Sequence, residues 1–301
     1  MQQGQDGKTA SLATAFAVAT IGIAFFSGMD AVMKALTLHV GAFNAMFWRV
    51  AVGTLLGGAI WFALRSPRPT RAALRVHLIR GVLSSFMAIL FFWGLARVPL
   101  AQGVALAFVA PLIALYLAAV LLGETIERRA ILGSLLGFAG VLVIMSAQAR
   151  ADMGTEALWG SASILASALL YAWNIILMRQ QALLAKPAEV AVFNSLVVTG
   201  CYLLVAPFLA ELPPAAEWPL ILGAAVLGLG SLMLLSWAYA RAEAQYLAPV
   251  EYTAFIWASL LGILVFAEPV GLLTILGAAM IVIACVIAAR RTRAADPATG
   301  V

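Results

Sequence analysis

The chain has 301 residues, of which 64% are hydrophobic and only 10% are charged. A water-soluble domain carries roughly 25% charged residues and cannot bury this much apolar surface in one core. The mean hydropathy of +1.04 therefore excludes a soluble enzyme, and the low charge excludes a disordered chain. The composition predicts an all-α protein that crosses a membrane many times.

Ten apolar segments follow one another along the chain, each long enough for a membrane-spanning helix of about 20 residues. They cover residues 12–34, 43–64, 78–97, 101–122, 130–148, 158–179, 189–209, 219–241, 246–267 and 270–289. Their continuous apolar character favours helices over membrane strands, in which apolar and polar residues alternate. The residues before Leu12 are polar and show no cleavable signal pattern, so we expect the first span to remain in the protein.

The positions of Lys and Arg predict the orientation of these spans. If the N-terminus is in the cytoplasm, 14 of the 18 basic residues lie in cytoplasmic segments. The other four are Lys34, Arg49, Arg97 and Arg150. Basic residues concentrate on the cytoplasmic side of membrane proteins. We therefore expect an inner-membrane protein with both termini in the cytoplasm, whose net charge of +5 reflects topology rather than nucleic-acid binding. The two histidines, His39 and His77, lie far apart, so we expect no metal site and no cofactor.

The second half of the chain repeats the first at an offset of 144 residues. Trp93-Gly-Leu-Ala-Arg97 falls on Trp237-Ala-Tyr-Ala-Arg241, and the register continues to Gly133 on Gly277. Asp30 falls on Asn174 at this offset, whereas Phe43-Asn44 meets Phe193-Asn194 at an offset of 150. The repeat predicts two units, 1–150 and 151–301, with five spans each. Because five is odd, the second unit is expected to be inverted, an architecture that recurs in secondary transporters with the substrate site between the units.

These repeated segments resemble a known family. The first copy carries Phe92-Trp-Gly-Leu-Ala-Arg-Val-Pro-Leu-Ala-Gln102, Pro111, Leu122-Gly-Glu-Thr-Ile126 and Leu132-Gly133; the second carries Pro249-Val-Glu-Tyr-Thr-Ala254, Phe266-Ala-Glu-Pro269 and Leu276-Gly277. Both copies resemble the EamA repeat of the drug/metabolite transporter superfamily, over essentially the whole chain. The resemblance implies ten helices around a central cavity that exports small metabolites, and it is nearest to the YddG-type amino-acid exporters.

Charged residues inside spans are costly in hydrocarbon and are therefore candidates for function. Asp30 and Lys34 lie four residues apart in the outer third of the first span, where they can bind a zwitterion or neutralise each other; Asp30 can also take up a proton. Arg49 in the second span can be a counter-charge to Asp30 or extend to lipid headgroups. Glu251 follows Pro249, which frees backbone carbonyl groups in the helix. These carbonyls and the carboxylate of Glu251 could bind an amine or a proton. Alternatively, Glu251 packs on a polar edge of the helix.

Uncharged candidates for the cavity lie in three other spans and in the ninth span beside Glu251. Asn174 and Tyr171 share a face of the sixth span and can bond a substrate or a neighbouring helix. Ser85, Trp237 and Tyr252 can line the cavity, although serine in membrane helices commonly bonds its own backbone. Glu124 and Glu268 end spans four and nine, where we expect them to cap free N–H groups.

The sequence therefore predicts a transporter rather than an enzyme. We expect an inner-membrane exporter of amino acids that works by alternating access, with bends at Pro111 and Pro249 and without an ATP-binding motif. Proton coupling and facilitated diffusion fit equally well, and the oligomeric state is left open. The alternatives are a same-fold transporter of drugs, vitamins or sugar nucleotides, and an intramembrane lipid-modifying enzyme, for which the sequence shows no catalytic constellation.

Overall fold

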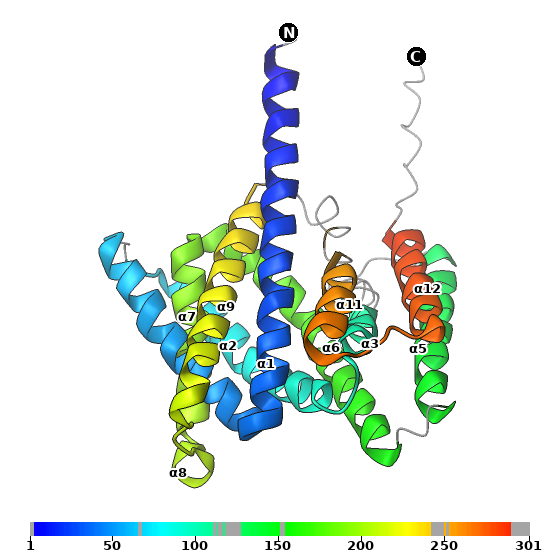
Figure 1. The fold of residues 1–301 in the computed structure, drawn as a ribbon. Helices are drawn as coiled ribbons and strands as arrows, with labels where there is room; N and C mark the ends of the chain where they lie inside the picture. Colours follow the sequence, from blue (N-terminus) through cyan, green and yellow to red (C-terminus); the bar gives the residue numbers. More distant parts are fainter. Residues whose placement is uncertain are drawn as a thin grey trace, which may run out of the picture.

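The computed structural model describes residues 3–65, 68–110, 113, 117, 128–150, 154–241, 250 and 253–289, and throughout these ranges the chain forms helices and the turns between them (Figure 1). The helices are α1 (Gln3–Ala63), α2 (Arg71–Leu95), α3 (Leu100–Ala107), α5 (Arg128–Arg150), α6 (Gly154–Leu184), α7 (Pro187–Leu203), α8 (Ala206–Leu209), η1 (Ala215–Glu217), α9 (Trp218–Tyr239), α11 (Thr253–Phe266) and α12 (Leu272–Ala289).

Helix α1 contains the first two predicted spans. It is divided at Gly41, whose φ of 79° and ψ of 158° are not helical. Glycine adopts such a positive φ readily because it has no Cβ. We call residues 3–40 the first arm of α1 and residues 42–63 its second arm. The helix continues beyond residue 34, where the first span is predicted to end, because nothing in its sequence stops it before the glycine.

The helices have the length and composition of membrane spans. Among the described residues, four segments are long and apolar enough to cross a bilayer: Thr14–Ala63, Arg71–Leu95, Gly154–Leu184 and Ala215–Tyr239. Thr14–Ala63, at 50 residues, is long enough for its two arms to cross separately. Shorter apolar helices cover Leu135–Ile144, Pro187–Leu203, Thr253–Phe266 and Leu272–Ala284. The described residues form helices, several of which are long and apolar, and this agrees with the predicted polytopic membrane protein.

Most of the packing joins helices that lie far apart in the sequence. The most extensive pairs are α1 with α9, α5 with α12, and α2 with α6. Close approach is possible in the α2–α6 pair because Gly94 and Gly160 face each other; a Cβ on Gly94 would lie 2.5 Å from the carbonyl oxygen of Gly160. The structure is thus held together mainly by contacts between the first and the second half of the chain.

The bundle has two ends that differ in their connections. We call the end where α1 begins the upper end and the end where α1 turns at Gly41 the lower end (Figure 1). A pocket of about 560 Å³ at the upper end is lined by residues from the early first arm, the end of α1, the start of α7 and the end of α9. The lower end includes α8 and the segment that leads into α9.

Candidate functional site

Buried polar groups without partners gather where α1 packs on α9. Asp30 is 3% exposed, and its Oδ1 atom has no hydrogen-bond partner among the residues that the structure describes. The same holds for the hydroxyl oxygens of Ser27 and Ser231 and for Nε of Arg49. An unpaired polar atom in a protein interior costs about 1–3 kcal/mol. We call Ser27, Asp30, Arg49 and Ser231 the α1–α9 cluster.

The two charged members of this cluster come from different arms of α1. Asp30 and Arg49 act on each other electrostatically but do not form an ion pair. The guanidinium of Arg49 lies over α9 at Gly228, where a Cβ would be 3.0 Å from Nη1. The absence of a side chain at Gly228 therefore makes the space that the guanidinium occupies.

Both charges lie well away from the ends of the helices. Asp30 precedes the break at Gly41 by 11 residues and Arg49 follows it by eight. At 1.5 Å per residue these separations are about 16 Å and about 12 Å along the two arms. That Asp30 lies in the outer third of its span stays a prediction, while the first arm itself continues beyond that predicted span to Gly41.

A second set of buried polar side chains joins α2 to α6. Asn174 donates from Nδ2 to Oγ of Ser84 at 2.8 Å and accepts at Oδ1 from Nε of Arg80 at 3.2 Å. Arg80 also donates from Nη1 to Oε1 of Gln181. All four side chains are buried. In contrast to Asp30, Asn174 has hydrogen-bond partners for both its amide nitrogen and its amide oxygen.

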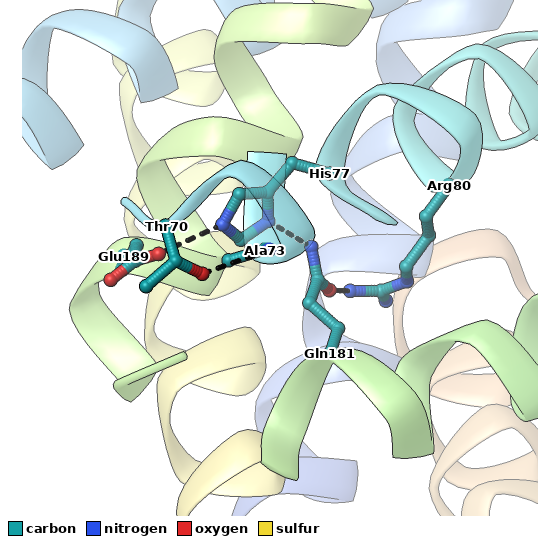
Figure 2. Close-up of polar contacts among 6 residues, drawn as sticks. All are labelled: Thr70, Ala73, His77, Arg80, Gln181 and Glu189. Carbon is teal, nitrogen blue, oxygen red and sulfur yellow. Dashed lines mark hydrogen bonds and ion pairs between the residues drawn. The ribbon is translucent and has the colours of Figure 1, made fainter. Parts of the chain in front are cut away.

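The same chain of hydrogen bonds continues to a buried histidine (Figure 2). Nε2 of Gln181 lies 2.5 Å from Nδ1 of His77, and Nε2 of His77 lies 3.1 Å from Oε1 of Glu189 at the start of α7. His77 is 0% exposed and its ring stacks on Phe193, with centroids 4.9 Å apart. Sequence reasoning missed this group because His77 and Glu189 lie 112 residues apart. The only local signal was His77 and Arg80 at a spacing of three, on one face of an apolar helix.

Lys34 does not pair with Asp30, so the predicted neutralisation of these two residues is wrong. Nζ of Lys34 lies 2.5 Å from Oε1 of Glu268 and donates to the carbonyl oxygen of Val98 at 2.8 Å. Oε2 of Glu268 accepts from the backbone N–H of Leu100, the first residue of α3, at 2.8 Å. Glu268 therefore caps a helix as predicted, but the helix belongs to the other half of the chain. Tertiary packing brings a closer carboxylate to Lys34 than the one on its own helix.

Three more contacts join the two halves at the lower end. Nδ1 of His39 lies 3.0 Å from Oε1 of Glu217, and Nε of Arg97 donates to Glu156 at 2.8 Å. The side chain of Asn44 accepts from the backbone N–H of Glu211 at 2.9 Å. The lower ends of the helices are therefore tied together by polar groups.

The remaining described candidates have different positions. Ser85 donates to the carbonyl oxygen of Gly81 in its own helix at 2.9 Å. Tyr171 lies on α6 and acts electrostatically on Arg80. Trp237 lines the pocket at the upper end, and its ring lies under the guanidinium of Arg241 at 3.9 Å. Thus Tyr171 and Asn174 lie together at the α2–α6 interface, Asp30 lies in the α1–α9 cluster, and Trp237 is at the upper end.

Four predicted site residues lie outside the described residues: Pro111, Pro249, Glu251 and Tyr252. Glu124 also lies outside them. Within the part of the chain that the structure describes, no group of three or more His, Cys, Asp or Glu side chains could hold a metal ion.

Curated proteins with similar sequences are membrane transporters of different small molecules. The chain is 28% identical to the pseudopaline exporter CntI of Pseudomonas aeruginosa over 88% of its length and 92% of the exporter. It is 30% identical to a riboflavin transporter of Rhizobium johnstonii, covering 86% of this chain and 85% of that protein. Its identity to an S-adenosylmethionine uptake transporter of Rickettsia bellii is 25%, over 87% of this chain and 91% of that protein.

A solved crystal structure of another protein has the same fold. It covers 92% of this chain and 96% of its own, with a TM-score of 0.64 at 22% sequence identity. The sequence profile of the EamA-like transporter family matches twice, at residues 13–146 and 158–290. Because these two matches cover most of the chain, the protein belongs to the EamA-like transporter family.

Proposed function

We propose that the protein is a secondary transporter of the inner membrane that exports small zwitterionic metabolites, with amino acids as the first candidates. The observation that carries the proposal is the α1–α9 cluster. There, a carboxylate oxygen of Asp30 and a guanidinium nitrogen of Arg49 are both buried and have no partner within the described part of the chain. A substrate that bears an ammonium and a carboxylate group would satisfy both atoms at once. Charges inside hydrocarbon that do not pair with each other commonly mark a substrate pathway.

The packing supports two inverted five-span units. In such an arrangement span one corresponds to span six, and span three corresponds to span eight. The α1–α9 pair, which joins spans one and eight, then corresponds to the α2–α6 pair, which joins spans six and three. The α5–α12 pair, which joins spans five and ten, corresponds to itself. The Trp-Arg motif of each copy also forms the same local contact: Arg97 lies 3.5 Å over Trp93, and Arg241 lies 3.9 Å over Trp237. Arg97 bonds to Glu156 at the lower end, whereas Trp237 lines the upper pocket.

Alternating access would occur by movement of one unit against the other, with Pro111 and Pro249 as bends. In the proposed orientation the upper end faces the cytoplasm. The bond between Lys34 and Glu268 then closes the outer side, because it ties the first unit to the second. Export would require this bond to break. The side chain of Glu268 is 25% exposed, so water can solvate its carboxylate when the outer side opens.

The second candidate is a vitamin transporter of the same fold, favoured by the 30% identity to the riboflavin transporter. A flavin carries no ammonium–carboxylate pair, so it would leave the free atoms of Asp30 and Arg49 without charged partners. Drugs and sugar nucleotides remain further alternatives within the fold. An intramembrane lipid-modifying enzyme has less support, because the family is one of transporters.

The test is uptake into liposomes that contain the purified protein, with a panel of radiolabelled amino acids and with riboflavin. We expect saturable uptake of several amino acids that compete with one another, and its loss in Arg49→Gln. Ser146→Ala is the matched control, because that hydroxyl bonds only within α5, to the carbonyl oxygen of Val143. Uptake of riboflavin but of no amino acid by the folded protein would reject the zwitterion and favour the vitamin.

A further inference from the structure

The hydrogen-bonded chain on α2, α6 and α7 runs from the upper end of the bundle to the level of Asn174. Its members in order are Glu189, His77, Gln181, Arg80, Asn174 and Ser84. Each is buried. Glu189 is the third residue of α7, and Gln181 lies three residues before the end of α6. One end of the chain is therefore next to the upper aqueous side, and the other lies about 15 Å along α6 from its end.

Arg80 determines where every proton of this chain lies. A guanidinium has only donors, so Gln181 must turn its oxygen to Arg80 and its NH₂ group to His77. Nδ1 of His77 is then an acceptor and carries no proton. The proton of a neutral ring lies on Nε2, which donates to the carboxylate of Glu189 at 3.1 Å. The geometry thus describes a neutral histidine that donates from Nε2 to Glu189.

A proton added to His77 cannot be accommodated without breaking this chain. It would bind the lone pair of Nδ1, which would then present an N–H to the NH₂ group of Gln181 at 2.5 Å. Gln181 cannot turn its amide to compensate, because its oxygen would leave Arg80 and its NH₂ group would face another donor. Protonation therefore separates His77 on α2 from Gln181 on α6, at the upper end of the bundle.

The surroundings suit a site that gains and loses one proton. The charges that act on His77 are the carboxylate of Glu189 on α7 and the guanidinium of Arg80 on α2. The carboxylate stabilises an imidazolium and the guanidinium opposes it. From α6 the facing side chain is the uncharged Gln181, while Tyr171 acts on Arg80. On α7 the Phe193 ring stacks on the imidazole at an interplanar angle of 12° and holds its orientation.

We propose that His77 and Glu189 form the proton-binding site that couples transport to the proton gradient, with protonation of Nδ1 releasing α2 from α6. This inference rests on the proposed transport function and on the proposed orientation. The neutral ring then belongs to a state in which His77 has released its proton to the cytoplasm and the outer side is closed by Lys34 and Glu268. Entry of one proton would accompany export of one substrate molecule.

The chain contains a matched control for this pair. The offset of 150 residues places Glu189 on His39, which lies 3.0 Å from Glu217 at the lower end. The side chain of His39 is 57% exposed, whereas that of His77 is 0% exposed. His39→Gln thus removes a histidine–glutamate contact of nearly the same length that is outside the buried chain.

The transport test compares two assays in liposomes with the amino-acid panel: exchange of substrate at equal pH, and accumulation driven by a pH gradient. At one proton per molecule, a gradient of one pH unit supports accumulation of about tenfold. We expect His77→Gln and Glu189→Gln to retain exchange and lose the accumulation, while His39→Gln behaves as the unaltered protein. Accumulation that survives in His77→Gln, or exchange without any gradient response in the unaltered protein, would overturn the coupling role.

A second test does not depend on the substrate. The His39→Gln protein contains a single histidine, so NMR of isotope-labelled histidine reports His77 alone. We expect a neutral ring with its proton on Nε2 at alkaline pH, and conversion to the imidazolium on acidification. A ring that stays neutral throughout, or that carries its proton on Nδ1, would contradict the proposal. Failure of all exchange in the transport test would instead reject the proposed substrate, and the spectrum would still decide the proton site.

Discussion

The α1–α9 and α2–α6 interfaces correspond to each other at the sequence offset of 144 residues, but their polar residues are bonded differently. The offset of 144 residues places Asp30 on Asn174 and Ser84 on Gly228. In the α2–α6 pair, Ser84 accepts a hydrogen bond from Asn174 at 2.8 Å. In the α1–α9 pair, glycine replaces that serine and a carboxylate replaces the amide, so an oxygen of Asp30 is left unpaired.

This difference separates a closed polar network from an open one. The amide of Asn174 is satisfied by the protein itself, as expected of buried polar groups that hold helices together. Oδ1 of Asp30 and Nε of Arg49 have no such partner among the described residues. The difference between the two interfaces is the basis on which the proposed function places substrate binding at the α1–α9 cluster.

The largest effect is expected when Asp30 is converted to its counterpart, in Asp30→Asn. A hydrogen bond to a charged group contributes about 1.5–3 kcal/mol, so the KM for a zwitterionic substrate should rise roughly 10- to 150-fold. The measurement is concentration-dependent uptake into liposomes. The reverse change in the other repeat, Asn174→Asp, should not create a second substrate site, because Arg80 is already bonded to that side chain. An unchanged KM in Asp30→Asn would remove Asp30 from the binding site.

A smaller loss is expected from Gly228→Ser, which gives α9 the residue that α2 has at Ser84. The new Cβ would lie 3.0 Å from Nη1 of Arg49, so the guanidinium must move, and the hydroxyl can bond the carboxylate of Asp30. Both effects close the site, and we expect the KM to rise by about tenfold, equivalent to about 1.4 kcal/mol. Gly223→Ser is the control, since a Cβ there meets nothing within 4 Å. Equal uptake by the two variants would show that the space at Gly228 is unimportant.

The α2–α6 network should respond in stability rather than in affinity. Ser84→Ala removes the acceptor of the Asn174 amide and leaves a buried donor unpaired. We expect a loss of about 1–2 kcal/mol in the free energy of unfolding, observed as a lower Tm of the purified protein. Ser85→Ala, one residue along, removes only a bond within its own helix and should change the Tm less. A similar Tm for both variants would argue against the network as a stabilising element.

The smallest effect concerns the two Trp-Arg pairs. Each arginine lies over the ring of the tryptophan four residues before it. Such a contact is commonly worth about 0.5–1 kcal/mol, so the Arg97→Cys and Arg241→Cys variants should both fold. In a background without Cys201 and Cys285, a membrane-impermeant thiol reagent applied to intact cells should label position 97 alone. Labelling of both positions from the same side would contradict the inverted arrangement.

Much of the helical architecture was predictable because membrane spans are local. A run of about 20 apolar residues forms its own hydrogen bonds and needs no distant partner to be recognised. Thus α6 (Gly154–Leu184) and α9 (Trp218–Tyr239) lie where the apolar segments 158–179 and 219–241 predict them. The family was also predictable, because the repeated Trp-Arg motif and the Leu-Gly pairs Leu132-Gly133 and Leu276-Gly277 are local sequence patterns, and the family profile matches both copies.

The polar sites were only partly predictable, because their members come from distant helices. Asp30 and Asn174 were found as polar residues inside apolar spans, but their spacing did not show that one is paired and the other is not. His77 and Glu189 each had an unremarkable local context. The pairing of Lys34 with Glu268 rather than Asp30 likewise depends on how α3 and α11 meet the first arm of α1.

The sequence by itself therefore determined the membrane class, the repeat and the positions of the helices, since these depend on hydropathy and on residues close together in the chain. Only the tertiary structure decided which buried polar groups satisfy each other. Gln181 accepts a hydrogen bond from Nη1 of Arg80 and directs its own NH₂ group to His77, while the missing side chain at Gly228 makes room for the guanidinium of Arg49. Hydrogen bonds act over about 3 Å, and the helices that supply both partners are brought to that distance only by packing.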